Sequence, residues 1–169
     1  MAGDLKQDVT RAARDVLAAS YPEGTHVRRT GASCHGAVAE VFVCFNIQHT
    51  QWRPEDGVRF CVNWGVVPQR SFAADPFGRG GRHPSYLDCP LVARGRLTPD
   101  PVATGDRWHE LHAPEALGPA LAEIRESAAR LWADRLAPML TEDWHRAELR
   151  KLPTSPIASR LLATLAPPA

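Results

Sequence analysis

The stretch EVFVCFNIQHTQWRPEDGVRFCVNWGVV, from Glu40 to Val67, decides the fold. Apolar and polar side chains alternate in each half of it, and the side chains of a strand point to opposite faces with a period of two residues. We therefore predict two neighbouring strands, at about 38–48 and 57–67, that share one apolar and one polar face. The apolar set is Val41, Val43, Phe45, Ile47, Val58, Phe60, Val62, Trp64 and Val66.

The connection between these strands predicts that they pair antiparallel. It contains Pro54 and ends in Asp56 and Gly57, residues that favour turns. Because the two apolar sets share a face, an odd-numbered residue of one strand must lie opposite an even-numbered residue of the other. Two registers that obey this rule place either Asn46 or Cys44 opposite Cys61, and the sequence does not choose between them.

The flanking segments predict helices. Asp4 to Ala19 and about 114–138 carry apolar side chains at helical spacing, and Thr141 is a suitable N-cap for a further helix to Leu152. Shorter elements are a strand at 25–29, a turn at 30–36, an irregular loop at 68–87, strands at 89–95 and 107–111, and a helix from Ser155.

These elements predict an α+β fold. A length of 169 residues suits one domain. We expect a single antiparallel sheet of about three to five strands, with N-terminal and C-terminal helices packed on its apolar face. Residues 1–152 would form this domain, and 153–169 a C-terminal extension with a short helix and a frayed tail.

The bulk composition narrows the function class. The net charge is +1, so no global field attracts nucleic acid or an anionic membrane. No apolar run approaches the ~20 residues of a membrane helix, and the N-terminus lacks the apolar centre of a signal peptide. We expect a cytoplasmic protein that does not contact a membrane. We expect reduced cysteines, in keeping with that location, because no CxxC pair occurs and two of them lie in the middle of predicted strands, where cysteine usually behaves as a small hydrophobic residue. The cysteines are Cys34, Cys44, Cys61 and Cys89.

Several short motifs, in order, resemble the domain of unknown function 4304 family. The similarity runs from about Leu5 to Leu140. The motifs are NIQ at Asn46–Gln48, FCVNWG at Phe60–Gly65, an Arg-Gly pair at Arg94–Gly95 and DRWHEL at Asp106–Leu111. The resemblance implies a small bacterial α+β domain without an established activity, whose relatives are discussed as immunity proteins of toxin systems.

The polar face of the two strands is the candidate site. Amides and a guanidinium can recognise a planar polar ligand or the backbone of a partner through directional hydrogen bonds. A plainer interpretation is a solvated sheet face, or an amide network that satisfies buried backbone. The candidate binding residues are Asn46, Gln48, Arg59 and Asn63 on the strands, with Arg94, Trp108 and the loop tryptophan Trp52.

Other chemistry has weaker support in the sequence. His109 and His112 lack the HExxH spacing of a zinc site, Cys34 and His35 are merely sequence neighbours, and no GxSxG elbow occurs. We expect neither a metal nor a cofactor. The GRGGR segment at Gly78–Arg82 could contact phosphate or RNA, but it lacks the GK[ST] of a P-loop.

These observations favour a non-catalytic binding protein whose polar sheet face and adjacent loops contact a protein partner, in the manner of an immunity protein. Two alternatives stay open. One is an enzyme for a small or nucleotide-related ligand, with an amide, arginine and tryptophan cleft. The other is nucleic-acid contact through GRGGR, which the near-zero net charge disfavours.

Overall fold

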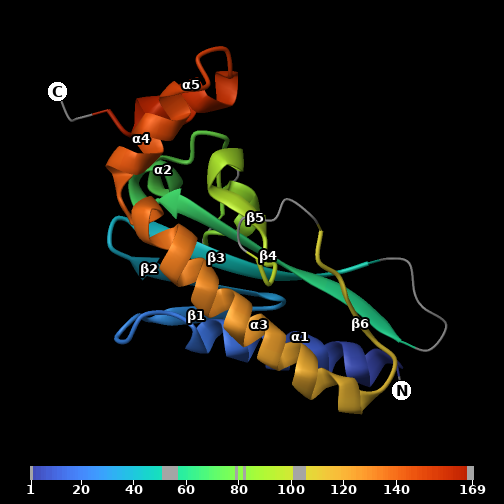
Figure 1. Ribbon diagram of the computed structural model, residues 1–169. Helices are drawn as coiled ribbons and strands as arrows, with labels where there is room; N and C mark the ends of the chain where they lie inside the picture. The colour runs from blue at the N-terminus through green and yellow to red at the C-terminus, as the bar shows by residue number, and fades with distance from the viewer. Residues whose placement is uncertain (1, 51–56, 79, 82, 101–105, 167–169) are drawn as a thin grey trace.

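The computed structural model describes residues 2–50, 57–78, 80–81, 83–100 and 106–166. Within them the chain forms one antiparallel sheet with helices, which confirms the α+β prediction (Figure 1). The strand order is β1-β2-β3-β4-β5, and β6 also pairs with β4. The strands are β1 (Val27–Thr30), β2 (Ser33–Val38), β3 (Val41–His49), β4 (Val58–Pro68), β5 (Arg94–Arg96) and β6 (His109–Leu111).

Two long helices, α1 and α3, lie side by side across one face of the sheet, and α4 and α5 gather at one end of the molecule (Figure 1). The α-helices are α1 (Ala2–Ala19), α2 (Gln69–Ala74), α3 (Leu117–Leu131), α4 (Glu142–Arg150) and α5 (Pro156–Thr164). Short helical turns are η1 (Tyr86–Asp88), η2 (Leu91–Ala93), η3 (Pro114–Ala116), the π-helical η4 (Trp132–Leu136) and η5 (Ala137–Leu140). None of these helices has the length and apolar character that a bilayer crossing needs.

The predicted apolar face forms the core. Phe45, Phe60 and Trp64 are almost fully buried against α1 and α3, as are the smaller residues of the alternating set. Burial of each such side chain stabilises the fold by about 1.5–3 kcal/mol. The apolar faces predicted for the strands and helices therefore pack together as the main stabilising layer. The predicted cap of α4 is also present, because Thr141 Oγ1 accepts from the backbone nitrogen of Trp144 at 3.4 Å.

The strand register obeys the predicted parity but differs from both registers considered. Asn46 lies opposite Asn63, and Gln48 lies opposite Cys61. Alternation fixes which face a side chain occupies, whereas a slide by two residues leaves every side chain on its face. For this reason the pattern could not select the register.

Three local predictions are wrong. Residues 30–36 are not merely a turn, because they include most of β2, where Gly36 leaves room for Tyr21 to pack closely. The 68–87 segment contains α2 and η1 and is not wholly irregular. Residues 89–95 hold η2 and only the start of β5, so the expected strand there is shorter. Because most of β2 falls in the expected turn, the sheet has six strands in the described residues, where about three to five were predicted.

Candidate functional site

The polar face of β3 and β4 is covered at one end. At the other, which we call the open end, Gln48 of β3 is exposed, whereas Cys61 and Asn63 of β4 are buried. At the covered end, Cys44, Val67 and Cys89 form a small buried cluster. Gly65 makes this possible, since a Cβ at that position would lie 2.7 Å from both Cβ and Sγ of Cys89. The segment that carries η1 therefore rests directly on the sheet, and the candidate site is confined to the open end.

A network of side-chain amides occupies the open end. Asn63, which is 2% exposed, donates through Nδ2 to Gln48 Oε1 at 2.9 Å and, more weakly, to Asn46 Oδ1 at 3.5 Å. Asn46 Nδ2 in turn donates to Ser33 Oγ at 3.0 Å. The buried Asn63 thus fixes the orientation of Gln48. The amide nitrogen of Gln48 has no hydrogen-bond partner in the described part of the chain, and this side chain is exposed.

These side chains border a groove of about 290 Å³ between the sheet and η1, which we call the amide groove. Its other wall carries the phenol of Tyr86, and the guanidinium of Arg94 lies 5.3 Å from the centre of that ring. Amide N–H, hydroxyl and guanidinium groups all donate hydrogen bonds. The lining residues are Ser33, Asn46, Gln48, Ser85, Tyr86 and Leu87.

A second cluster lies beside the network, where β5 and β6 flank β4. The guanidinium carbons of Arg59 and Arg96 lie 5.1 and 4.7 Å from the ring centre of Trp108. Each arginine also contacts a carboxylate, Arg59 that of Glu110 at 3.1 Å and Arg96 that of Asp106 at 3.2 Å. These contacts neutralise part of the charge of both arginines. The cluster therefore contributes mainly packing at the edge of the site.

The structure brings together only part of the predicted site. Asn46, Gln48 and Asn63 share one network, and Arg94 stands beside it on Tyr86. Arg59 and Trp108 belong to the neighbouring cluster, which touches the network because Arg96 pairs with Asn63 in the sheet. Trp52 lies outside the described residues, as do Arg79 and Arg82 of the GRGGR segment.

Sequence reasoning missed Tyr86, Leu87 and Arg96. Arg96 could have been found, because it follows Arg94 by two residues in a strand and so shares its face. A glycine inside a buried strand, Gly65, signals close approach of another backbone, although it does not say which one. Nothing in the sequence places Tyr86 over Asn46.

The thiols of this sheet are not activated. Burial raises the pKa of Cys34 to about 12 and also raises the pKa of Cys61. His35 follows Cys34 in β2, so its side chain points to the other face, where its ring stacks on His83 at 5.4 Å between ring centres. Burial, helped by the charges of His83 and Arg28, lowers the pKa of His35. These two residues therefore do not form a thiolate–imidazole pair.

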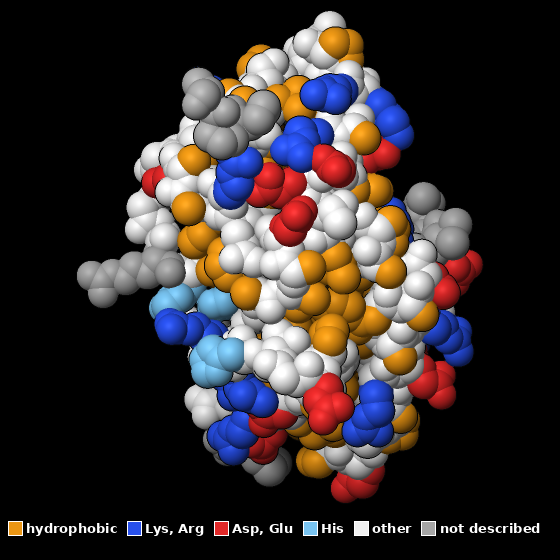
Figure 2. Space-filling model, turned by 90° about the vertical axis from the view of Figure 1, so that its left-hand side faces the viewer, with side chains coloured by type: hydrophobic (Ala, Val, Ile, Leu, Met, Phe, Trp, Pro, Cys, Tyr) orange, Lys and Arg blue, Asp and Glu red, His pale blue; other side chains and the backbone are white. Residues whose placement is uncertain are grey.

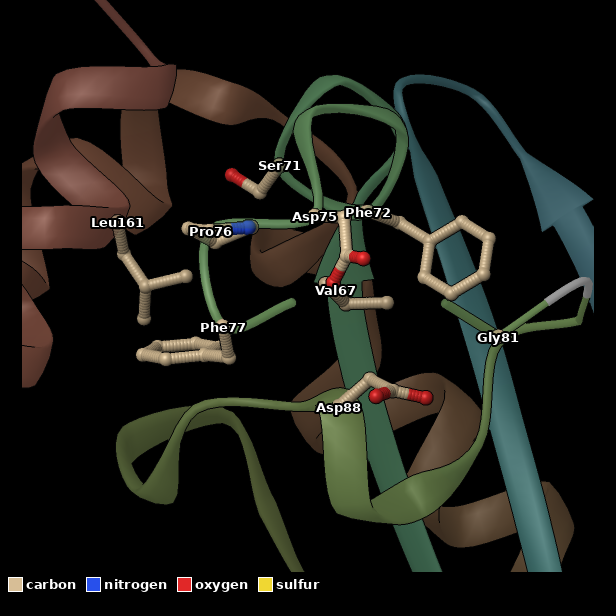
Figure 3. Close-up of a pocket in the computed structure, with 9 residues that line it drawn as sticks. All are labelled: Val67, Ser71, Phe72, Asp75, Pro76, Phe77, Gly81, Asp88 and Leu161. Atoms are coloured by element: carbon tan, nitrogen blue, oxygen red, sulfur yellow. The ribbon is translucent and has the colours of Figure 1, made fainter. Parts of the chain in front are cut away.

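A separate cavity beneath α2 holds only about 20 Å³, room for about one water molecule. Figure 3 shows Phe77 beneath Leu161 on one side of it and Phe72 on the other. This small space between α2, η1 and α5 cannot hold a ligand larger than a water molecule.

Figure 2 shows the face of the molecule that lies to the left in Figure 1. Basic and acidic side chains are interspersed there around an apolar centre, and histidines gather at one edge. No single sign of charge dominates this face, in keeping with the net charge of +1. Among the residues that the structure describes, no three histidine, cysteine or acidic side chains lie close enough together to hold a metal ion. No protein-family model, curated protein sequence or solved structure matches this chain.

Proposed function

We propose that this chain is a binding protein that contacts a protein partner through the amide groove and the segments beside it. The observation that carries the proposal is the fixed orientation of Gln48. Its oxygen accepts from the buried Asn63, so its two amide N–H groups are directed to solvent. An amide held in one orientation costs little further entropy when a partner binds, which favours specific recognition.

The groups around the groove specify the kind of contact. Gln48, the Tyr86 phenol and Arg94 supply donors, so the partner group would be an acceptor, such as a backbone carbonyl or a carboxylate. A protein surface supplies such acceptors together with apolar side chains. The immunity-like role that the resemblance to the domain of unknown function 4304 family implies is one such partnership, with a toxin as the partner.

A small polar ligand is the second candidate. Tyr86 offers a ring for stacking beside the amides, and the volume of the groove lies just below the range of about 300–1,000 Å³ typical of ligand sites. A ligand-binding enzyme would use the same residues. Nucleic-acid contact through Arg79 and Arg82 stays a prediction from the sequence alone, as do the cytoplasmic location and the division at residue 152.

A conservative substitution tests the proposal. Gln48→Glu keeps the oxygen that accepts from Asn63 but replaces the outward donors with an acceptor, which would repel an acceptor on the partner. We expect a photo-crosslinking residue placed at Leu87 to capture one stoichiometric partner in the source cells. The purified partner should then bind the Gln48→Glu variant about tenfold or more weakly.

The matched control is Gln7→Glu, which makes the same change at an exposed position of α1 and should leave the affinity unchanged. Equal affinity of the Gln48→Glu variant and the unmodified protein would refute the protein-partner proposal. Native mass spectrometry that shows instead a small molecule, displaced by Gln48→Glu, would favour the second candidate.

A further inference from the structure

A second groove lies next to the amide groove, and most of the side chains that line it are apolar. It runs between the η1–η2 segment and α5, with a volume of about 380 Å³. Four large hydrophobic side chains are exposed among the described residues, and three of them line this groove. They are Leu87, Leu91 and Ile157, at 62%, 71% and 54% exposure. Such a concentration of exposed apolar side chains is typical of a binding surface.

The fold does not require these side chains to be apolar. In α5, the buried stripe is Ala158, Leu161 and Leu165, which pack on Leu149 of α4. Ile157 lies about 100° around the helix from Ala158 and outside that stripe. Leu91, at the start of η2, is likewise directed away from the core. Polar side chains at these two positions would serve the fold equally well.

Charge on the groove rim indicates what it would accept. Arg94 and Arg160 both line the groove, and neither forms an ion pair with a carboxylate in the described residues. The acidic residue of the lining, Asp88, already accepts hydrogen bonds at 2.8 Å from the backbone nitrogen and the hydroxyl of Ser85. The groove therefore combines an apolar floor with cationic edges.

We propose that this arginine-rimmed groove docks a short amphipathic segment of a partner protein, in which leucine-like side chains are flanked by carboxylates. The apolar side chains would fill the space between Leu91 and Ile157, and the carboxylates would pair with Arg94 and Arg160. The inference rests on the proposed function, because Leu87 lines both grooves and one partner would span them. It adds the chemical class of the partner.

Fluorescence anisotropy with three labelled helical peptides tests this docking. The first has a leucine face and a glutamate face, the second has lysine in place of glutamate, and the third has alanine in place of leucine. We expect the full-length protein to bind the leucine–glutamate peptide about tenfold or more tightly than either of the others. Leu91→Glu should weaken that binding about tenfold, and because Leu91 is exposed the variant should still fold.

Charge reversal provides the sharper control. In the Arg160→Glu variant, the preference should shift toward the leucine–lysine peptide, which a purely apolar surface would not show. Equal binding of all three peptides, absence of binding to any of them, or indifference to Leu91→Glu would overturn the inference. It would also fall if the protein proved to be a dimer that Leu91→Glu dissociates, since a second copy would then be the occupant.

The two proposals can fail separately. If Gln48→Glu weakens binding of the crosslinked partner whereas Leu91→Glu and Arg160→Glu do not, the amide groove stands and the docking of an acidic segment falls. If none of the three variants affects that partner, the proposed function itself fails.

Discussion

His145 is a buried histidine whose titration should make the stability of the protein depend on pH. It is fully buried in α4, and its Nε2 lies 3.0 Å from the carbonyl oxygen of Met139, to which it donates. Burial lowers the pKa of His145 to about 4. Because an unfolded histidine has a pKa of about 6.5, the unfolded chain takes up a proton between these values and the folded protein does not.

The free energy of unfolding should therefore be insensitive to this group above about pH 6.5 and fall as the pH drops toward 4, by up to about 3 kcal/mol. His145→Gln keeps a donor for Met139 and does not titrate. Urea unfolding near pH 7 and near pH 5 should show a loss of stability that is about 2 kcal/mol smaller in this variant.

Some acid sensitivity should remain in the His145→Gln variant, because burial and Lys6 also lower the pKa of His49 to about 4. His26→Gln, at an exposed position, is the matched control and should retain the full sensitivity of the unmodified protein. Superimposable pH profiles of the His145→Gln variant and the unmodified protein would show that His145 does not cause the effect.

Among the elements, the contact between β4 and the η1–η2 segment positions the wall that both grooves share. It depends on Gly65, over which Cys89 lies. Gly65→Ala would place its Cβ 2.7 Å from Cys89 Sγ and 3.3 Å from the Cβ of Arg94, so the segment would have to move away from the strand. We expect a loss of stability of about 1–3 kcal/mol in urea unfolding, the usual effect of overpacking.

Gly118→Ala supplies the comparison for Gly65→Ala. Apart from its chain neighbours and its own helix backbone, no atom lies within 4 Å of a Cβ built there. The gain in helix propensity is opposed by Pro119, which disfavours helical backbone for a non-glycine residue before it, so the loss of stability should be smaller than that of Gly65→Ala. Equal stability of the Gly65→Ala variant and the unmodified protein would mean that the η1–η2 segment is held less closely than its contacts indicate.

The same elements show how far the sequence could predict this molecule. Strands β3 and β4 were predictable because their period of two extends over many residues and fixes their faces. The η1–η2 segment was not, because its short turns are set by contacts with distant residues, such as Cys89 on Gly65 and Tyr86 beside Asn46. The amides of the candidate site lie on the predictable strands, whereas the wall that makes them a groove lies on the other segment.

At the scale of the whole molecule, two cores matter besides the Cys44, Val67 and Cys89 cluster: a large one and a small one. The large core joins α1, α3 and the sheet, whereas the small one holds α5 on α4 through Leu149, Ala158, Leu161 and Leu165. The arginine-rimmed groove lies where the second core meets the η1–η2 segment. Its shape should therefore depend on a part of the molecule that is stabilised by few contacts.

Leu161→Ala tests this division. Leu161 is 2% exposed and lies in both the small core and the groove lining, so its truncation should cost about 2–4 kcal/mol in the packing of α5. In native-state hydrogen exchange, the amides of α5 should therefore exchange faster in this variant. Leu131→Ala, in the large core, supplies the contrast: it should accelerate the most protected amides of β3 and β4 but leave those of α5 unchanged, because the large core stays packed when α5 opens without the sheet. If Leu131→Ala accelerates exchange of α5 as much as that of the sheet, the two cores unfold as one cooperative unit and the groove is as rigid as the sheet.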